Sequence, residues 1–126
     1  MSRTALSDEE QIVRAVFTND WDGERIFSRT FTGPETSVSR LSVRSLTLQW
    51  EIFRKFQRPP VRELELFLEI GVGTLKRVAA NWKAKPTKLS VVEDPQPDNP
   101  AHGLILEAMS SGLAKEVIKN CQRHDE

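Results

Sequence analysis

Six polar side chains in this sequence have the chemistry to build a site: one histidine, three arginines and two serines. They are His102, Arg14, Ser28, Arg29, Ser39 and Arg40. An imidazole can accept or donate a proton near neutral pH, so His102 is the candidate catalytic residue. Arginine guanidinium groups bind phosphate or carboxylate through paired hydrogen bonds, and serine hydroxyls can complete such a pocket. The other five residues are therefore candidate ligand-binding residues.

Each of these candidates also has a purely structural interpretation. His102 follows a proline-rich stretch, residues 94–100, and its ring could simply hydrogen-bond the preceding loop. The arginines could lie on a solvated sheet face, where Asp22, Glu24 and Glu35 would balance their charge. A lone histidine becomes a site candidate only when partners converge on it. The sequence leaves both interpretations open, and the position of His102 relative to the arginines distinguishes them.

Complete catalytic and cofactor motifs are absent. The segment Gly71-Val72-Gly73 lacks the remaining residues of a Walker-type phosphate loop and of a dinucleotide-binding fingerprint. With one cysteine, Cys121, an internal disulfide and a cysteine-cluster zinc site are both excluded. The sequence therefore predicts no metal site, assigns no cofactor and leaves open whether the protein is an enzyme.

Charge and hydropathy limit the possible partners. Eighteen basic and eighteen acidic side chains cancel, so no overall field draws the chain towards nucleic acid or an anionic membrane. No apolar run approaches the roughly 18–20 residues of a membrane span, and residues 1–10 lack the apolar core of a signal peptide. We therefore predict a cytoplasmic protein whose partner is another protein or a small anionic ligand. A homo-oligomer is compatible with these features.

The hydrophobic pattern predicts an α+β fold in one domain, residues 10–122, with a flexible N-terminus at 1–9 and a tail at 123–126. Strands are expected at 11–18, 25–32, 37–43, 63–70 and 89–92, the first two as a hairpin. Helices are expected at 46–57, 74–82, 100–109 and 113–121. The last two could also be one helix with a weak middle. We therefore expect a small, mainly antiparallel or mixed sheet with three to four helices packed on it.

Two of these elements depend on particular residues. The run 63–70 fits a strand or a helical stripe, and the glycines at 71 and 73 favour the strand because each costs a helix about 0.8–1 kcal/mol relative to alanine. Asn99 suits a helix N-cap, and Pro100 suits the first helical position. His102 would then lie in the first turn of a helix.

Three segments carry a resemblance to a known family. They are Phe27-Ser28-x-x-Phe31, Ser37-Val38-Ser39-Arg40 and Val92-x-Asp94-Pro95-x-Pro97-x-Asn99-Pro100-Ala101-His102. They resemble a family of uncharacterised small bacterial proteins over about residues 11–120 of this chain. Similar sequences often have alanine after the histidine, where this chain has Gly103. The resemblance implies a bacterial, cytoplasmic protein and no particular activity.

Two function hypotheses follow. The first is a protein-interaction or ligand-binding module without catalysis of its own. The second is a small nucleotide- or phosphate-directed enzyme, in which residues 37–40 and Arg14 or Arg29 meet His102. A third hypothesis, nucleic-acid binding through a local basic patch, is disfavoured by the zero net charge.

Overall fold

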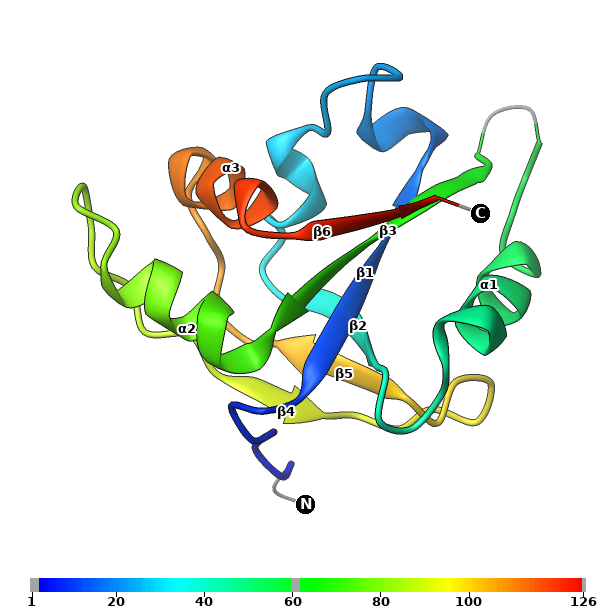
Figure 1. Ribbon diagram of the computed structural model, residues 1–126, viewed down its shortest axis with the longest axis horizontal. Coiled ribbons are helices and arrows are strands. Elements are labelled where there is room, and N and C mark those ends of the chain that lie inside the picture. Colours follow the sequence, from blue (N-terminus) through cyan, green and yellow to red (C-terminus); the bar gives the residue numbers. More distant parts are fainter. Residues whose placement is uncertain (1–2, 60–61, 126) are drawn as a thin grey trace.

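A six-stranded antiparallel sheet forms the centre of the computed structural model, which describes residues 3–59 and 62–125 (Figure 1). The strand order is β4-β5-β2-β1-β3-β6. The strands are β1 (Gln11–Phe17), β2 (Thr36–Arg40), β3 (Leu64–Gly71), β4 (Val91–Glu93), β5 (His102–Ile105) and β6 (Gln122–Asp125). The helices are α1 (Leu46–Arg54), α2 (Val72–Ala80) and α3 (Ser111–Lys119), with short 3₁₀ helices η1 (Thr18–Asp20) and η2 (Ser28–Thr30). The predicted α+β class in a single domain is confirmed.

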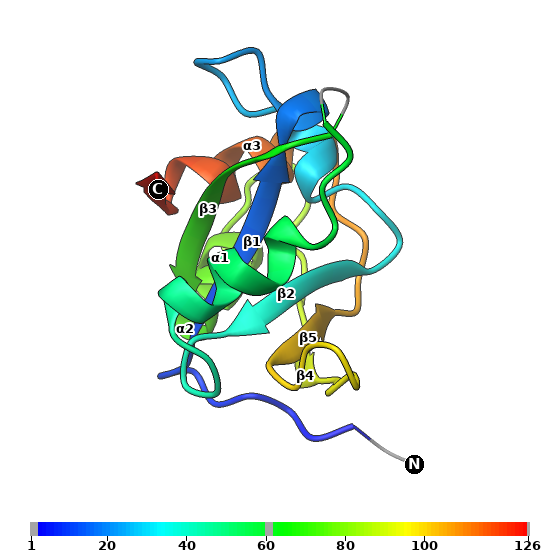
Figure 2. The same cartoon turned by 90° about the vertical axis from the view of Figure 1, so that its right-hand side faces the viewer.

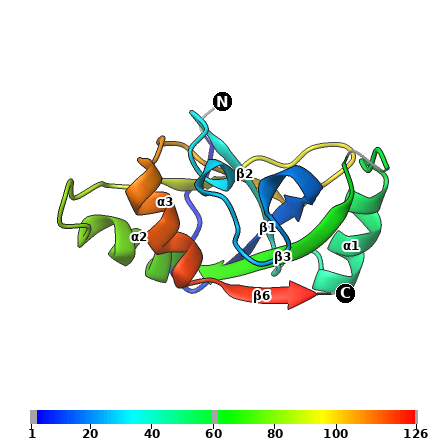
Figure 3. The same cartoon turned by 90° about the horizontal axis from the view of Figure 1, so that it is seen from above.

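The sheet separates two hydrophobic cores because β1 is apolar on both faces. Ile12 and Val16 belong to the larger core, which α2 and α3 cover, whereas Val13 and Ala15 belong to the smaller core under α1. Successive side chains of a strand point to opposite faces, so this alternation places helices on both sides of the sheet. The view from above shows α2 and α3 on one side and α1 on the other (Figure 3).

Helix α1 forms where the sequence predicts a helix. The hydroxyl of Ser45 accepts a hydrogen bond from the Leu48 backbone N–H at 3.3 Å, which caps the first turn. Its inward face packs against the smaller core, and the Trp50 ring meets Phe67 of β3 edge-on at 5.1 Å between centroids. Seen from its own side of the sheet, α1 lies across β1 and β3 (Figure 2).

The prediction of a strand at 63–70 followed by a helix is also confirmed, with α2 beginning at Val72. By contrast, the predicted strand at 25–32 is wrong. This segment contains η2, and β1 pairs with β2 and β3 instead of forming a hairpin with it. Ile26 and Phe31 are buried five residues apart, a spacing that fits a folded loop and not the alternation of a strand.

The predicted helix at 100–109 is wrong as well. Asn99 and Gln96 exchange backbone hydrogen bonds at 3.1 Å, which closes a hairpin between β4 and β5. The Asn99 side chain caps this turn by accepting from the Ala101 N–H at 3.2 Å. His102 therefore begins strand β5 and not a helix. The helix predicted at 113–121 is present as α3, and it runs through Gly112.

The first and last segments that the structure describes, from residue 3 and up to residue 125, lie against the sheet, where the sequence predicted a flexible start and a tail. The Leu6 N–H donates to Val91 O and the Glu93 N–H donates to Thr4 O, each at 2.9 Å, so this segment lies along β4. Leu6 is buried in the larger core. At the other end, β6 pairs with β3. None of the helices within residues 3–59 and 62–125 is long and apolar enough to span a membrane.

Candidate functional site

The structure places His102 and Ser39 directly opposite each other in the pairing of β5 with β2. Ser39 also pairs with Val13, whose side chain lies in the core under α1. Arg40 pairs with Ile12 of the other core, and Arg14 has the same parity in β1 as Ile12. Because strand side chains alternate between faces, His102 and Ser39 lie on one face of the sheet and the two arginines on the other.

The His102 ring joins the two ends of the β4–β5 hairpin. Its Nδ1 lies 3.0 Å from both the backbone oxygen and Oδ2 of Asp94. Arg3 Nε lies 3.4 Å from the other carboxylate oxygen of Asp94. Ser39 is 1% exposed, and its hydroxyl accepts a hydrogen bond from Asn99 Nδ2 at 3.1 Å. A serine so deeply buried is out of reach of a substrate, so this group closes the hairpin.

Arg40 forms a paired contact with Glu10. Its Nε and Nη2 donate to the two Glu10 carboxylate oxygens at 2.9 and 3.1 Å, and its Nη1 lies 3.5 Å from Glu93. Burial alone would raise the pKa of Glu10, but hydrogen bonds from Arg40 and Ser42 outweigh it and lower the pKa. The Arg40 guanidinium therefore joins the start of β1 to β4.

Arg14 and Arg29 are also held by neighbouring groups. Arg14 donates from Nε to Thr30 O at 3.1 Å and from Nη1 to Ser37 O at 3.0 Å, which attaches η2 to β2. Burial lowers the pKa of Arg14, and nearby Asp20 opposes this effect. Arg29 lies 3.7 Å from the Asp20 carboxylate. The structure thus does not bring the six candidate residues into one group.

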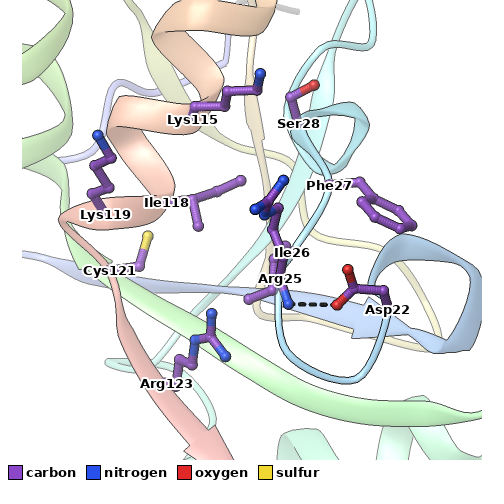
Figure 4. Close-up of a pocket in the computed structure, with 10 residues that line it drawn as sticks. All are labelled: Asp22, Arg25, Ile26, Phe27, Ser28, Lys115, Ile118, Lys119, Cys121 and Arg123. Atoms are coloured by element: carbon purple, nitrogen blue, oxygen red, sulfur yellow. Dashed lines mark hydrogen bonds between the residues drawn. The ribbon is translucent and has the colours of Figure 1, made fainter.

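A pocket of about 660 Å³ lies instead between residues 22–28, the last turns of α3 and the start of β6 (Figure 4). Four basic side chains line it, and one carboxylate, that of Asp22, accompanies them. The basic residues are Arg25, Lys115, Lys119 and Arg123. In Figure 4 the guanidinium groups of Arg25 and Arg123 face the middle of the pocket, and Lys115 and Ser28 lie at one end. Ser28 is the one member of the predicted six that lines this pocket.

A tight turn positions the loop wall of the pocket. Asp22 Oδ1 accepts hydrogen bonds from the backbone N–H groups of Arg25 at 2.6 Å and Glu24 at 2.9 Å. These two bonds lower the pKa of the Asp22 carboxyl, and the nearby Arg25 guanidinium adds to the effect. Gly23 has a φ of +96°, a conformation that glycine adopts without the strain a side chain would cause. The turn thus engages the carboxylate and leaves the Arg25 side chain free to face the pocket.

Helix α3 and strand β6 provide the opposite wall. The Ser110 hydroxyl accepts from the Leu113 N–H at 3.2 Å and caps α3, which places Lys115 and Lys119 four residues apart on one side of the helix. Arg123 Nη1 donates to Glu24 O at 3.0 Å, and this bond joins β6 to the loop. Two segments almost a hundred residues apart in sequence therefore meet at the pocket.

The bottom of the pocket is apolar. Ile26 is buried, and Ile118 packs against the larger core beside it. The Cys121 thiol donates to Val117 O at 3.3 Å, and burial raises its pKa to about 12. A thiol with a pKa raised in this way is a weak nucleophile at neutral pH. The pocket therefore has a positively charged rim and an apolar floor without a reactive group.

The positive charge of the pocket is only partly balanced. Lys119 Nζ lies 3.9 Å from Glu116 on the same helix, which is a weak surface contact. No hydrogen bond or ion pair joins the Lys115 ammonium group to any residue in the described part of the chain. Within that part, no three His, Cys, Asp or Glu side chains gather where they could hold a metal ion. The arrangement is suited to attract an anion.

The six site residues predicted from the sequence include none of the four basic residues of the pocket. The spacing of Lys115 and Lys119 on an expected helix shows that these two share a helix side. Nothing in the local sequence indicates that Arg25 and Arg123 lie beside Lys115 and Lys119, because that depends on the pairing of β6 with β3.

Comparison with known proteins does not add to this picture: no protein-family model, curated protein or solved structure matches the chain.

Proposed function

We propose that this protein is a binding module for a small anionic ligand, which it holds in the pocket between residues 22–28 and α3. The observation that carries the proposal is the set of four basic side chains around one pocket, accompanied by a single carboxylate that already accepts two backbone hydrogen bonds. Such a site has a surplus of positive charge for a ligand to neutralise. This ligand is a phosphate or carboxylate compound.

The shape of the pocket supports a ligand larger than a single ion. A volume of about 660 Å³ lies within the roughly 300–1,000 Å³ that is usual for small-molecule sites. Ile26 and Ile118 provide apolar surface below the basic rim. A ligand with an anionic group and an apolar or ring portion would satisfy both parts, as a nucleotide does.

The same lining favours binding over catalysis. Its described residues include no histidine, its thiol stays protonated at neutral pH, and the Asp22 carboxylate is engaged by the turn. Covalent catalysis needs an activated nucleophile, and proton transfer needs a free acid or base. We therefore propose a module that binds its ligand without transforming it.

Isothermal titration calorimetry with inorganic phosphate, pyrophosphate and adenosine triphosphate at low salt tests this proposal. Saturable binding is expected for at least one of them, and Lys115→Ala and Arg123→Ala should each weaken it at least about 10-fold, since a hydrogen bond to a charged group contributes roughly 1.5–3 kcal/mol. Lys85→Ala is the matched control, because Lys85 is exposed outside the pocket. An equal loss in all three variants, or no binding by any of the three anions, would refute the proposal.

A further inference from the structure

The exposed large hydrophobic side chains of the described residues gather around α1. They are Val43, Leu48 and Phe56, which are 42%, 38% and 37% exposed. Leu48, the half-buried Ile52 and Phe56 follow one another at intervals of four residues, so they form a stripe along one side of the helix and its last turn. Val43 lies in the turn that leads into the helix. We call these four residues the α1 surface.

The α1 surface lies beside the side of the helix that holds it to the sheet, and the two meet where the Phe56 ring packs edge-on against Phe53 at 6.1 Å between centroids. Leu46, Trp50 and Phe53 form that inner side and pack against β1 and β3. A helix on the outside of a domain needs one apolar side for its own fold, with polar residues elsewhere. The second stripe is therefore not required by the fold, and a contiguous exposed apolar surface of this kind is typical of an interaction site.

The segment that carries the α1 surface is rich in basic residues. Residues 43–58 contain four basic side chains and one acidic side chain, although the whole chain has equal numbers of each. Lys55 and Arg58 are exposed, and Arg44 is half-buried. Charge is complementary across most specific interfaces, so a partner of this surface has acidic residues beside its apolar ones.

We propose that the α1 surface docks an acidic amphipathic helix of another protein. The stripe from Leu48 to Phe56 is about 12 Å long at 1.5 Å per residue, which matches the span of anchors at positions i, i+3 or i+4, and i+7 of a bound helix. Glutamate or aspartate residues flanking those anchors meet Lys55, Arg58 and Arg44. This docking site is distinct from the anion pocket, and neither proposal depends on the other.

Other occupants fit the surface less well. A second copy of the chain, docked through the same surface, would place two basic surfaces against each other. An anionic membrane would match the charge, but the more apolar side of α1, with Leu46, Trp50 and Phe53, packs on the sheet and is not available to insert among lipids. Nucleic acid would use the basic residues and leave the apolar stripe without a role.

Fluorescence anisotropy with two designed peptides tests the proposal on the full chain. Both peptides carry leucine at the same helical anchor positions, and the remaining positions are glutamate in one and lysine in the other. The glutamate peptide should bind at least about 10-fold more tightly than the lysine peptide, and high salt should weaken it. Leu48→Ser and Phe56→Ser should each reduce binding about 5- to 10-fold, as expected for anchors at the centre of an interface.

Controls separate this result from changes in folding and from the anion pocket. Circular dichroism confirms that the serine variants are folded, and Lys115→Ala in the pocket should bind the glutamate peptide like the unchanged protein. No saturable binding, equal binding of the two peptides, or binding that neither serine substitution alters would each overturn the proposal. So would a dimer in sedimentation that Leu48→Ser abolishes, or binding to phosphatidylserine vesicles in place of the glutamate peptide.

Discussion

The thiol of Cys121 shows how burial removes a reactive group from use. It lines the anion pocket, yet it donates to Val117 O and its pKa is raised to about 12. At pH 8 the thiolate fraction is on the order of a thousandfold lower than in a free cysteine with a pKa of about 8.5. We expect iodoacetamide to modify the folded protein at least about 100-fold more slowly than the urea-unfolded protein. A folded rate close to that of free cysteine would contradict this prediction.

The Glu10–Arg40 pair makes stability depend on pH at the acid end. The pKa of Glu10 is lower in the folded protein, so its contribution is complete above the unfolded value of about 4.3 and is lost as pH falls through the folded value. Arg40→Met should therefore lower the free energy of unfolding by about 1–3 kcal/mol at pH 7, where a charged hydrogen-bonded pair is broken. Urea unfolding at pH 7 and pH 3 should show the loss shrinking at the lower pH. Lys85→Met serves as the exposed control, and a loss that does not change with pH would contradict the assignment.

At the scale of single elements, helix α1 contains one buried polar side chain that lowers the stability of the fold. Gln49 is fully buried, and neither its Nε2 nor its Oε1 has a hydrogen-bond partner among the described residues. Replacing an unsatisfied buried amide by an apolar side chain of similar size removes a desolvation penalty, so Gln49→Met should stabilise the protein by about 1–2 kcal/mol. Gln57→Met is the matched control, since Gln57 Oε1 accepts from the Leu64 N–H at 2.9 Å and its loss should destabilise. Thermal unfolding of both variants measures the contrast, and destabilisation by both would disprove the argument.

The elements that were predicted correctly from the sequence are those whose conformation is determined by their local sequence. The three- to four-residue spacing of Leu46, Trp50 and Phe53 and the cap at Ser45 specify α1 locally. The alternation of Leu64, Leu66, Leu68 and Ile70 specifies β3, which ends at Gly71. The pattern at Asn99 is ambiguous because an asparagine before a proline caps a helix or closes a turn equally well. Strand β5 has four residues and lies between β2 and β4, so its conformation depends on partners that no local pattern reveals. Gly103 fits this location, because a Cβ there would lie 2.9 Å from Val92 O.

At the scale of the whole molecule, the candidate sites depend on distant contacts. The residue types that suggest chemistry, such as His102 and Arg40, are engaged with Asp94 and Glu10. The four basic pocket residues come from a loop near the N-terminus and from the last helix and strand. Their meeting requires β6 to pair with β3 and α3 to pack on the larger core. Sequence periodicity indicates single elements but not how they pack together. This is why only one of the six predicted site residues, Ser28, lines the pocket.

Zero net charge conceals an uneven distribution, since the anion pocket and the region around α1 are each basic. If the pocket binds an anion only in the folded state, ligand at a hundred times its Kd should raise the free energy of unfolding by about 2.7 kcal/mol. We expect thermal unfolding with pyrophosphate to show this stabilisation at low salt, and added sodium chloride should reduce it because the pocket is open to screening ions. Arg123→Ala should abolish most of the shift, whereas Leu48→Ser on the α1 surface should leave it unchanged. A shift that survives Arg123→Ala, or one of the same size in high salt, would mean that pyrophosphate stabilises the fold from somewhere other than this pocket.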